Sequence, residues 1–171
     1  GGENVFLQDG NSLAVKTERV VEVLRYLRER LPSIQRITTY GRAETLSKIS
    51  VEQYKALKEA GLSRIHSGFE SGSDRVLALI NKGATSEQEI TAGKNIREAG
   101  IELSVYFMPG IGGKDLSEEN ALETARVVRA INPDFVRIRT AVVKEDTELW
   151  QDYLDGKFKL CSENEKLTEI K

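Results

Sequence analysis

The chain contains very few of the residues from which disulfides and metal centres are made. Cysteine occurs once among its 171 residues, at Cys161. A single cysteine excludes an intrachain disulfide and any multi-cysteine metal site made within these residues. Cys161 also lies outside the repeated pattern described below, and we interpret it as an incidental thiol.

Long apolar runs and an excess of charge of one sign are also absent. No run approaches the roughly 18 residues that a membrane-spanning helix needs, and the amino terminus lacks the basic and apolar regions of a signal peptide. Lys plus Arg number 25 and Asp plus Glu number 27, which gives a net charge of −2. This balance supplies no electrostatic case for nucleic acid or a membrane as a partner. We therefore expect a soluble, cytoplasmic protein.

The chain does contain a β–α pattern that repeats along most of its length. Short apolar strands alternate with amphipathic helices, and the strand centres lie near Val5, Ile37, Ile65, Val105 and Val136. This alternation predicts a parallel sheet with right-handed crossovers, in a wound sheet or a barrel. The length suits one domain with a sizeable core but is too short for a complete eight-stranded α/β barrel.

Capping boxes predict where three of the helices begin, because a Ser hydroxyl and a Gln or Glu three residues later satisfy the first free amides. The pairs are Ser50 with Gln53, Ser86 with Glu89, and Ser162 with Glu165. The chain lacks an initiator Met and ends soon after the third pair. We therefore expect a piece of a longer protein, with an incomplete barrel at residues 1–143 and a truncated helical extension at residues 144–171.

The stretch Arg64–Asp74 is a strand that runs into a tight polar turn and then opens a helix. The turn holds the carboxylate of Glu70 at the carboxyl end of the strand, beside a helix amino terminus that favours anions. Gly72 lets the backbone bend there or approach a ligand closely. The simpler interpretation is a well-capped strand-to-helix turn.

The carboxyl ends of all five predicted strands are polar or rich in glycine, which is where parallel α/β folds bind ligands. Turn chemistry alone would produce some of this pattern. The segments are Asp9-Gly10-Asn11, Tyr40-Gly41-Arg42, Glu70-Ser71-Gly72-Ser73, Pro109-Gly110-Ile111-Gly112-Gly113, and Arg139-Thr140.

The two faces of the predicted sheet differ in character. One set of alternating positions suits packing beneath the helices: Ile65, Phe69, Leu103, Val105, Phe107, Val136 and Ile138. The opposite set is polar and partly charged: Tyr40, His66, Glu70, Ser104, Tyr106, Met108, Arg137 and Arg139. A polar inner face is costly unless it lines a wet or ligand-filled cavity. The alternative is an exposed sheet face. His66 is either a proton donor or ligand there, or a structural residue.

Three segments carry a resemblance to a known family: GFESGSDRVLALINKG at 68–83, SVYFMPGIGG at 104–113, and FVRIRT at 135–140. Together they resemble the radical S-adenosylmethionine (radical SAM) enzymes, and most closely the branch of oxygen-independent coproporphyrinogen oxidase-like proteins. The match runs from the first strand to about Asp155. It implies an α/β fold, a partial parallel (β/α)6 TIM-type barrel with an open polar lumen, of which these strands are the second to sixth.

The resemblance also implies a chemistry. In this family a CxxxCxxC loop holds a [4Fe–4S] cluster that reductively cleaves S-adenosylmethionine, and the resulting 5′-deoxyadenosyl radical abstracts hydrogen from a substrate. An electron donor such as flavodoxin or ferredoxin supplies the electron. No such cysteine triplet occurs in this chain. We therefore expect the cluster ligands upstream of Gly1, an inactive fragment, and an oxidoreductase of unknown substrate when full-length.

By resemblance, the strand ends hold the cofactor. The turn at 9–11 replaces the family loop that binds the methionine amino group, the 70–71 turn faces the ribose or methionine carboxylate, and the 108–112 segment lies near adenine. The expected cofactor-binding residues are Asp9, Gly10, Asn11, Tyr40, Arg42, Glu70, Ser71, Met108, Pro109, Gly110 and Arg139. This hypothesis requires Glu70 and Arg139 on the same side of the sheet.

Two other functions are compatible with the sequence. One is a barrel enzyme that binds a phosphate ligand at Gly110–Gly113, although this loop lacks the P-loop ending and the dinucleotide spacing. The other is a non-catalytic interaction module on a βα scaffold, since a fold does not determine function.

Overall fold

The computed structural model describes residues 2–171, in which five parallel strands form one sheet. The strands are β1 (Asn4–Leu7), β2 (Arg36–Tyr40), β3 (Leu62–Glu70), β4 (Glu102–Phe107) and β5 (Phe135–Ile138). Each strand pairs with the next one along the chain, so the spatial order is β1-β2-β3-β4-β5. A doubly wound sheet would reverse its order at a switch point. The sequential order is that of a barrel wall, which confirms the predicted α/β partial barrel.

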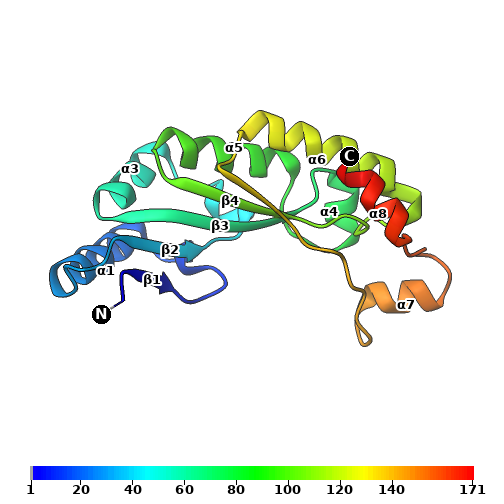
Figure 1. Ribbon diagram of the computed structural model, residues 1–171, viewed down its shortest axis with the longest axis horizontal. Coiled ribbons are helices and arrows are strands. Elements are labelled where there is room, and N and C mark those ends of the chain that lie inside the picture. Colours follow the sequence, from blue (N-terminus) through cyan, green and yellow to red (C-terminus); the bar gives the residue numbers. More distant parts are fainter. Residues whose placement is uncertain (1) are drawn as a thin grey trace.

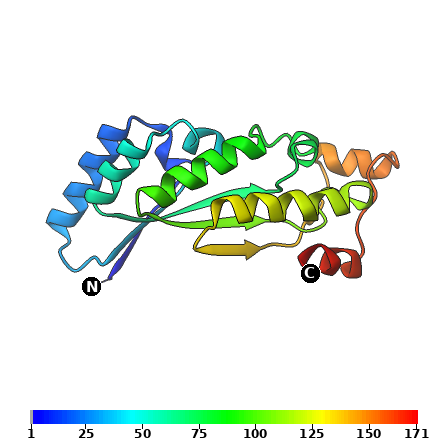
Figure 2. The same ribbon diagram turned by 90° about the horizontal axis from the view of Figure 1, so that it is seen from above.

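The helices cover one face of this curved sheet and leave the other without a helical layer (Figures 1 and 2). Neighbouring helices contact each other in chain order, α1 with α3, α3 with α5, and α5 with α6. The four are α1 (Thr17–Arg30), α3 (Val51–Glu59), α5 (Ser86–Glu98) and α6 (Ser117–Ile131). We call the uncovered side the inner face.

Shorter elements complete the chain. They are η1 (Ser12–Ala14), α2 (Ala43–Leu46), α4 (Asp74–Leu79), η2 (Lys114–Leu116), α7 (Glu148–Leu154) and α8 (Glu163–Ile170). Helix α8 packs against α6, whereas Figure 1 shows α7 lying away from the sheet. None of the helices in the described chain is long and apolar enough to cross a membrane.

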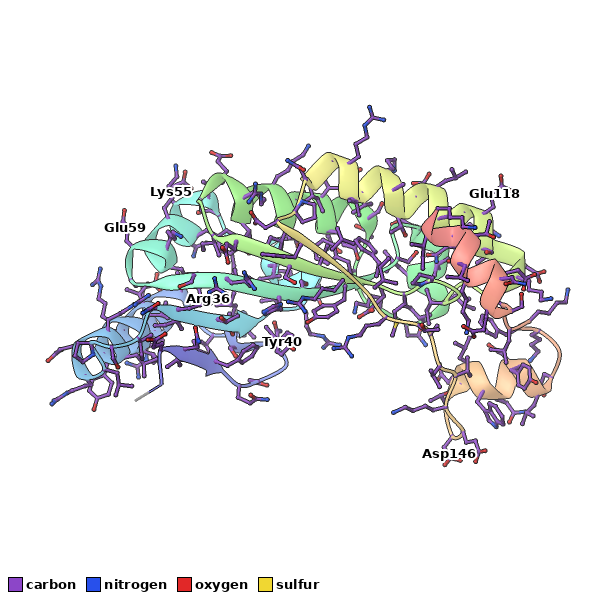
Figure 3. The ribbon with its side chains drawn as sticks, in the orientation of Figure 1. Arg36, Tyr40, Lys55, Glu59, Glu118 and Asp146 are labelled. Carbon is purple, nitrogen blue, oxygen red and sulfur yellow. The ribbon has the colours of Figure 1, made fainter. Side chains whose placement is uncertain are left out.

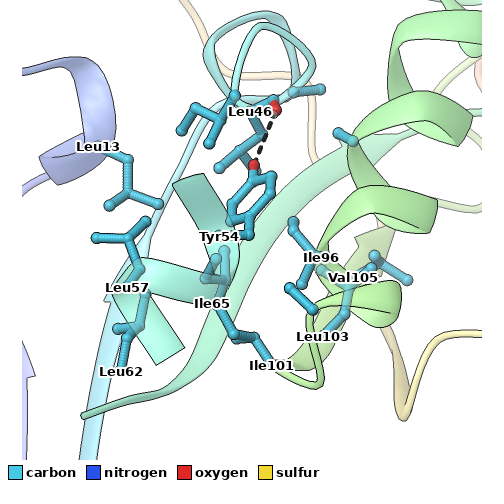
Figure 4. Close-up of a cluster of buried hydrophobic side chains, with 14 of the residues drawn as sticks. Leu13, Leu46, Tyr54, Leu57, Leu62, Ile65, Ile96, Ile101, Leu103 and Val105 are labelled. Carbon is cyan, nitrogen blue, oxygen red and sulfur yellow. Dashed lines mark hydrogen bonds between the residues drawn. The ribbon is translucent and has the colours of Figure 1, made fainter. Parts of the chain in front are cut away.

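The core lies between the sheet and the helices, where apolar stripes of the helices meet alternate strand residues (Figure 4). Tyr54 of α3 is fully buried there and donates its hydroxyl to the carbonyl of Leu46, at 2.8 Å. The strand residues predicted to pack beneath the helices are buried at five positions: Ile65, Phe69, Leu103, Val105 and Phe107.

Val136 and Ile138 of β5 lie on the predicted side, beside Ala121 and Ala125 of α6, but they are less covered than predicted, with exposures of 45% and 48%. A strand of a βα arc is covered by the helices on both sides of it, and β5 is the last strand of this sheet. Helix α6 precedes β5, but α7, which follows it, does not return to the sheet (Figure 1). The outer face of β5 is therefore only partly covered.

Two of the predicted capping boxes, at Ser50 and Ser162, are formed. The third was wrong by one residue. Helix α5 is capped by Thr85, whose hydroxyl accepts from the amide of Gln88 while the Gln88 side chain accepts from the amide of Thr85. Thr85 and Ser86 are both suitable caps, and only the packing of the helix decides between them.

This shift of the cap turns Glu89 into the core instead of back to the helix end. Its side chain is fully buried, and neither carboxyl oxygen has a hydrogen-bond partner within residues 2–171. Burial raises the pKa of Glu89 to about 10, and the nearby charges of Glu70 and Asp74 add to the rise while Lys82 opposes it. Glu89 is therefore protonated at neutral pH.

We expect Glu89→Gln to stabilise the fold at neutral pH. The folded chain binds the Glu89 proton more tightly than the unfolded chain does, so stability is lost as the pH rises from about 4.5 towards about 10. Removing this titration should raise the free energy of unfolding at pH 7 by on the order of 1 to 3 kcal/mol. Urea unfolding at pH 5, 7 and 9 measures it.

The matched control is Glu98→Gln, an exposed residue of the same helix, which should leave the pH dependence unchanged. An equal pH dependence of unfolding in wild type and Glu89→Gln would contradict a buried, protonated Glu89.

Candidate functional site

A row of side chains crosses the inner face from β1 to β4. The ring centroids lie 4.9 Å apart for Phe6 and Tyr40, 5.5 Å for Tyr40 and His66, and 6.2 Å for His66 and Tyr106. Figure 3 shows Tyr40 on the side of the sheet away from the outer helical residues Lys55 and Glu59. Each of the four strands β1 to β4 thus contributes one ring to this row.

Two arginines from the end of the sheet extend this surface. The guanidinium carbons of Arg137 and Arg139 lie 5.9 and 5.1 Å from the centroid of the Tyr106 ring. Arg137 also donates through Nε to the Ser104 hydroxyl at 3.0 Å. We call Phe6, Tyr40, His66, Tyr106, Arg137 and Arg139 the inner-face row.

Glu70 ends β3 in an unusual backbone conformation. Its φ of 72° lies in the left-handed region, which costs a non-glycine residue about 1 to 3 kcal/mol. A register shift between Gly68 and Glu70 accompanies it. The side chain folds back over Gly68, where a Cβ atom would lie 2.3 Å from Glu70 Oε1. The carboxylate therefore occupies space that only a glycine at position 68 leaves free.

Lys82 is the partner of Glu70. Its Nζ donates to Glu70 Oε1 at 2.9 Å, and both side chains are about four-fifths buried. Lys82 lies in the break after α4 that Asn81 and Gly83 mark. The sequence prediction missed Lys82, because nothing local to a helix-breaking triplet shows that its lysine reaches back to a strand twelve residues earlier.

The structure places Glu70 and Arg139 on the same face, as the cofactor hypothesis requires. Gly68, over which Glu70 folds, pairs with Tyr106 across β3 and β4, so their side-chain positions share a face. Arg139 stacks on that same Tyr106 ring.

The first two strand ends are joined by Asn11. Its Oδ1 accepts from the backbone amide of Arg42 at 3.0 Å, and its Nδ2 donates to Thr45 Oγ1 at 2.9 Å. Asp9 and Gly10 beside it are exposed, as is the side chain of Arg42. The predicted 9–11 and 40–42 segments therefore meet at one edge of the sheet.

The turn after Glu70 is tied to the rest of the chain by hydrogen bonds of Ser71, Gly72 and Ser73. Ser71 Oγ accepts from the amide of Ser73 at 3.0 Å and donates to Asn120 Oδ1 at 2.6 Å. Ser73 caps α4, and the amide of Gly72 donates to Thr124 Oγ1 at 2.9 Å. A Cβ on Gly72 would lie 2.3 Å from the carbonyl oxygen of Glu123, so the glycine permits close packing against α6. This turn matches the simpler interpretation of a capped junction.

The 108–113 loop is covered by α8. Glu169 accepts from the amide of Gly110 at 2.9 Å, from Ser117 Oγ at 2.6 Å and from Asn120 Nδ2 at 2.7 Å. Pro109 and Gly110 are buried, whereas Met108 is half-buried. The structure therefore does not bring Pro109 and Gly110 to the inner-face row. Sequence reasoning missed Glu169, which is separated from this loop by 59 residues.

His66 is buried in the middle of the row, and its Nδ1 has no hydrogen-bond partner in the described part of the chain. Burial lowers the pKa of His66, and the positive charges of Arg137 and Arg64 lower it further. A neutral imidazole is thus held between the rings of Tyr40 and Tyr106 at physiological pH.

An NMR titration of His66, the only histidine in the chain, should give a pKa below the ordinary 6.5. The unfolded chain then takes up this proton first on acidification, so the folded state loses stability as the pH falls below 6.5. Arg137→Gln should raise the pKa, while Arg30→Gln, an arginine on helix α1, should not. A wild-type pKa at or above 6.5 would contradict this environment.

These residues do not fit an iron–sulfur cluster. Cys161 is the single thiol, is buried, and lies 3.9 Å from Glu169 Oε1. Burial and the Glu169 carboxylate raise its pKa, which disfavours the thiolate that a cluster needs. Across residues 2–171 there is also no group of three His, Cys, Asp or Glu residues able to hold a metal ion. The strand end at Glu70 instead presents a carboxylate paired with an ammonium, that of Lys82, at 2.9 Å.

Comparison with known proteins identifies the family. The model of the Radical SAM superfamily matches residues 1–125. An uncharacterized methyltransferase of Pyrococcus horikoshii is 30% identical over 116 residues, which are 68% of this chain and 25% of that protein. A tRNA-2-methylthio-N(6)-dimethylallyladenosine synthase of Syntrophus aciditrophicus is 30% identical over 149 residues, 81% of this chain and 32% of that protein.

The fold is also similar to that of a solved radical SAM enzyme. Coproporphyrinogen III oxidase (HemN) from Escherichia coli superposes with a TM-score of 0.72 at 18% identity, over 98% of this chain and 38% of that one. This chain thus spans only a quarter to a third of the length of the two relatives above. Because the family model covers most of its residues, the chain belongs to the radical SAM superfamily, whose members use S-adenosylmethionine and a [4Fe–4S] cluster.

Proposed function

We propose that this chain supplies the S-adenosylmethionine-binding wall of a radical SAM enzyme. The observation that carries the proposal is the Glu70–Lys82 pair, a carboxylate and an ammonium held together at a strand end on the inner face. Family membership supports it independently.

The chemistry of the pair suits the two polar ends of this ligand. S-adenosylmethionine presents a ribose diol, an ammonium and a carboxylate. The Glu70 carboxylate accepts hydrogen bonds from a diol or an ammonium, and Lys82 complements a carboxylate. Because Lys82 Nζ donates to Glu70 Oε1 at 2.9 Å, both groups are positioned before the ligand arrives.

The other strand ends complete the proposed site. The edge formed by Asp9, Gly10, Asn11, Tyr40 and Arg42 lies at the first two strands. Ser71 and Met108 flank Glu70, since the Met108 amide donates to the Glu70 carbonyl at 2.8 Å. Pro109 and Gly110 act through the position of Met108, because α8 covers them. We assign the incomplete barrel to residues 1–143 and the helical extension, of which α8 covers the 108–113 loop, to residues 144–171.

The overall reaction follows from the family in outline only. When bound, the cluster of radical SAM enzymes supplies the electron that cleaves S-adenosylmethionine, and we propose an oxidoreductase that abstracts hydrogen, served by a flavodoxin or ferredoxin in the cytoplasm. One relative is named as a methyltransferase and another as a synthase, so methyl transfer and synthase reactions are alternatives to this overall reaction. One of those relatives is named for a tRNA product, so the balanced charge of this chain gives no ground for excluding nucleic acid.

The contacts of the 110–113 loop argue against a phosphate-binding barrel. The Gly110 amide, which a phosphate would need, already donates to Glu169. Gly113 is equally covered, since a Cβ there would meet Lys159 and Phe158 at 2.8 Å. A phosphate would have to displace a carboxylate held by three donors.

Glu70→Ala should weaken binding of S-adenosylmethionine at least tenfold, which corresponds to about 1.4 kcal/mol. The loss of a charged hydrogen-bond acceptor typically has this size or more. Glu70→Gln, which keeps the shape, should weaken it in the same direction, and so should Lys82→Met. Isothermal titration calorimetry with S-adenosylhomocysteine, an unreactive analogue, provides the measurement.

Glu102→Gln is the matched control. It removes another strand carboxylate, one that pairs with Arg64 at 2.7 Å, and should leave the affinity unchanged. Unchanged affinity in Glu70→Ala would remove Glu70 from the site, provided that thermal melting shows a folded variant.

A further inference from the structure

We propose that the inner-face row binds a flat aromatic anion, the substrate group that the enzyme presents to S-adenosylmethionine. This inference deepens the proposed function and rests on it. The row shares Tyr40 with the proposed cofactor edge, but it excludes Glu70 and Lys82, the pair on which the proposed function depends.

The positive charge at one end of the inner-face row favours an anionic ligand. Two cations next to this face are paired within the chain, Arg64 with Glu102 at 2.7 Å and Lys82 with Glu70 at 2.9 Å. Arg137 and Arg139, by contrast, form no ion pair with any residue from 2 to 171. Two exposed guanidiniums beside one ring leave a local positive charge of about two. The complement of such a site is a carboxylate or a phosphate.

The four rings of the inner-face row favour an aromatic ligand. Four rings, with neighbouring centroids 4.9 to 6.2 Å apart and ring planes tilted by 43° to 53°, provide an apolar surface next to these cations. A base or another aromatic ring stacks favourably on such side chains. The surface is also partly open, since Phe6 is 39% exposed and Tyr40 and Tyr106 are half-buried.

The central ring of the row, that of His66, is uncharged. His66 lies between Tyr40 and Tyr106, and burial together with the neighbouring arginines disfavours its protonation. The middle of the row therefore remains uncharged, while the positive charge is confined to one end. A ligand with an uncharged ring at one end and an anion at the other matches this arrangement.

Two sources share this chemistry: a nucleotide, with a base and a phosphate, and an aromatic carboxylate. The probes that separate them are adenosine 5′-monophosphate and 2-naphthoate. Adenosine and inorganic phosphate each supply one half of the recognised group. All titrations use the 171-residue chain with saturating S-adenosylhomocysteine, so that the adenosine of a probe cannot report the cofactor site.

We expect at least one charged aromatic probe to bind tenfold or more tightly than adenosine and than inorganic phosphate. Binding of the monophosphate alone identifies a nucleotide source, and binding of naphthoate alone identifies an aromatic carboxylate. The double variant Arg137→Gln/Arg139→Gln should weaken the bound probe at least tenfold. Arg30→Gln should not, although Arg30 lies 5.5 Å from the Tyr26 ring on α1 and is thus an arginine–tyrosine pair outside the row.

The single variant Arg139→Gln tests whether weaker probe binding in the double variant is caused by misfolding. The Arg139 side chain makes no hydrogen bond or ion pair in the described structure, so its replacement should leave the melting temperature unchanged and still weaken the probe threefold or more. Equal binding of charged and uncharged probes, or an affinity within twofold in the folded double variant, would overturn the proposal. Unchanged S-adenosylhomocysteine affinity in Glu70→Ala, with the probe still weakened by the double variant, means that the proposed function fails. Weakened S-adenosylhomocysteine binding in Glu70→Ala, with probe affinity unchanged in the double variant, means that only the proposal for the row fails.

Discussion

The packing of helices on a single face of the sheet is the constraint on which the rest of this structure depends. Side chains alternate between the two faces of a strand, so a sheet covered on one side sorts its residues by polarity. Ile65, Leu103 and Val105 are buried under the helices, while His66, Ser104 and Tyr106 point the other way. Polar side chains therefore gather on the inner face, and the apolar core lies under the helical layer.

Glu70 lies where these two requirements meet. It ends the longest strand of the sheet, and its left-handed backbone and the missing side chain of Gly68 together place its carboxylate over the inner face. The next turn is tied to α6 through Gly72 and Ser71, which holds the strained residue in place. Local strain that the surrounding structure maintains is often found at binding sites. Lys82 pairs with the carboxylate of this residue at 2.9 Å, so two side chains of opposite charge meet at one strand end.

Periodicity in the sequence predicted what depends on neighbouring residues. The five strands, the parallel sheet and the polar inner face follow from alternation and from helix spacing, and all of them are present. The same patterns could not predict contacts between distant segments. Lys82 on Glu70, Glu169 on Gly110 and the exposure of Val136 all depend on how elements pack in space. The predicted cap of α5 was wrong by one residue because Thr85 and Ser86 both carry a hydroxyl that can cap a helix. The burial of Glu89 depends on which of the two is used.

We propose that the strand ends of the inner face hold S-adenosylmethionine. A crystal structure of this chain with S-adenosylhomocysteine tests this binding site. We expect the amino acid portion of the ligand against Glu70 and Lys82, with the 9–11 and 40–42 segments beside it. A ligand bound over the outer helices, or at the 110–113 loop in place of Glu169, would contradict it.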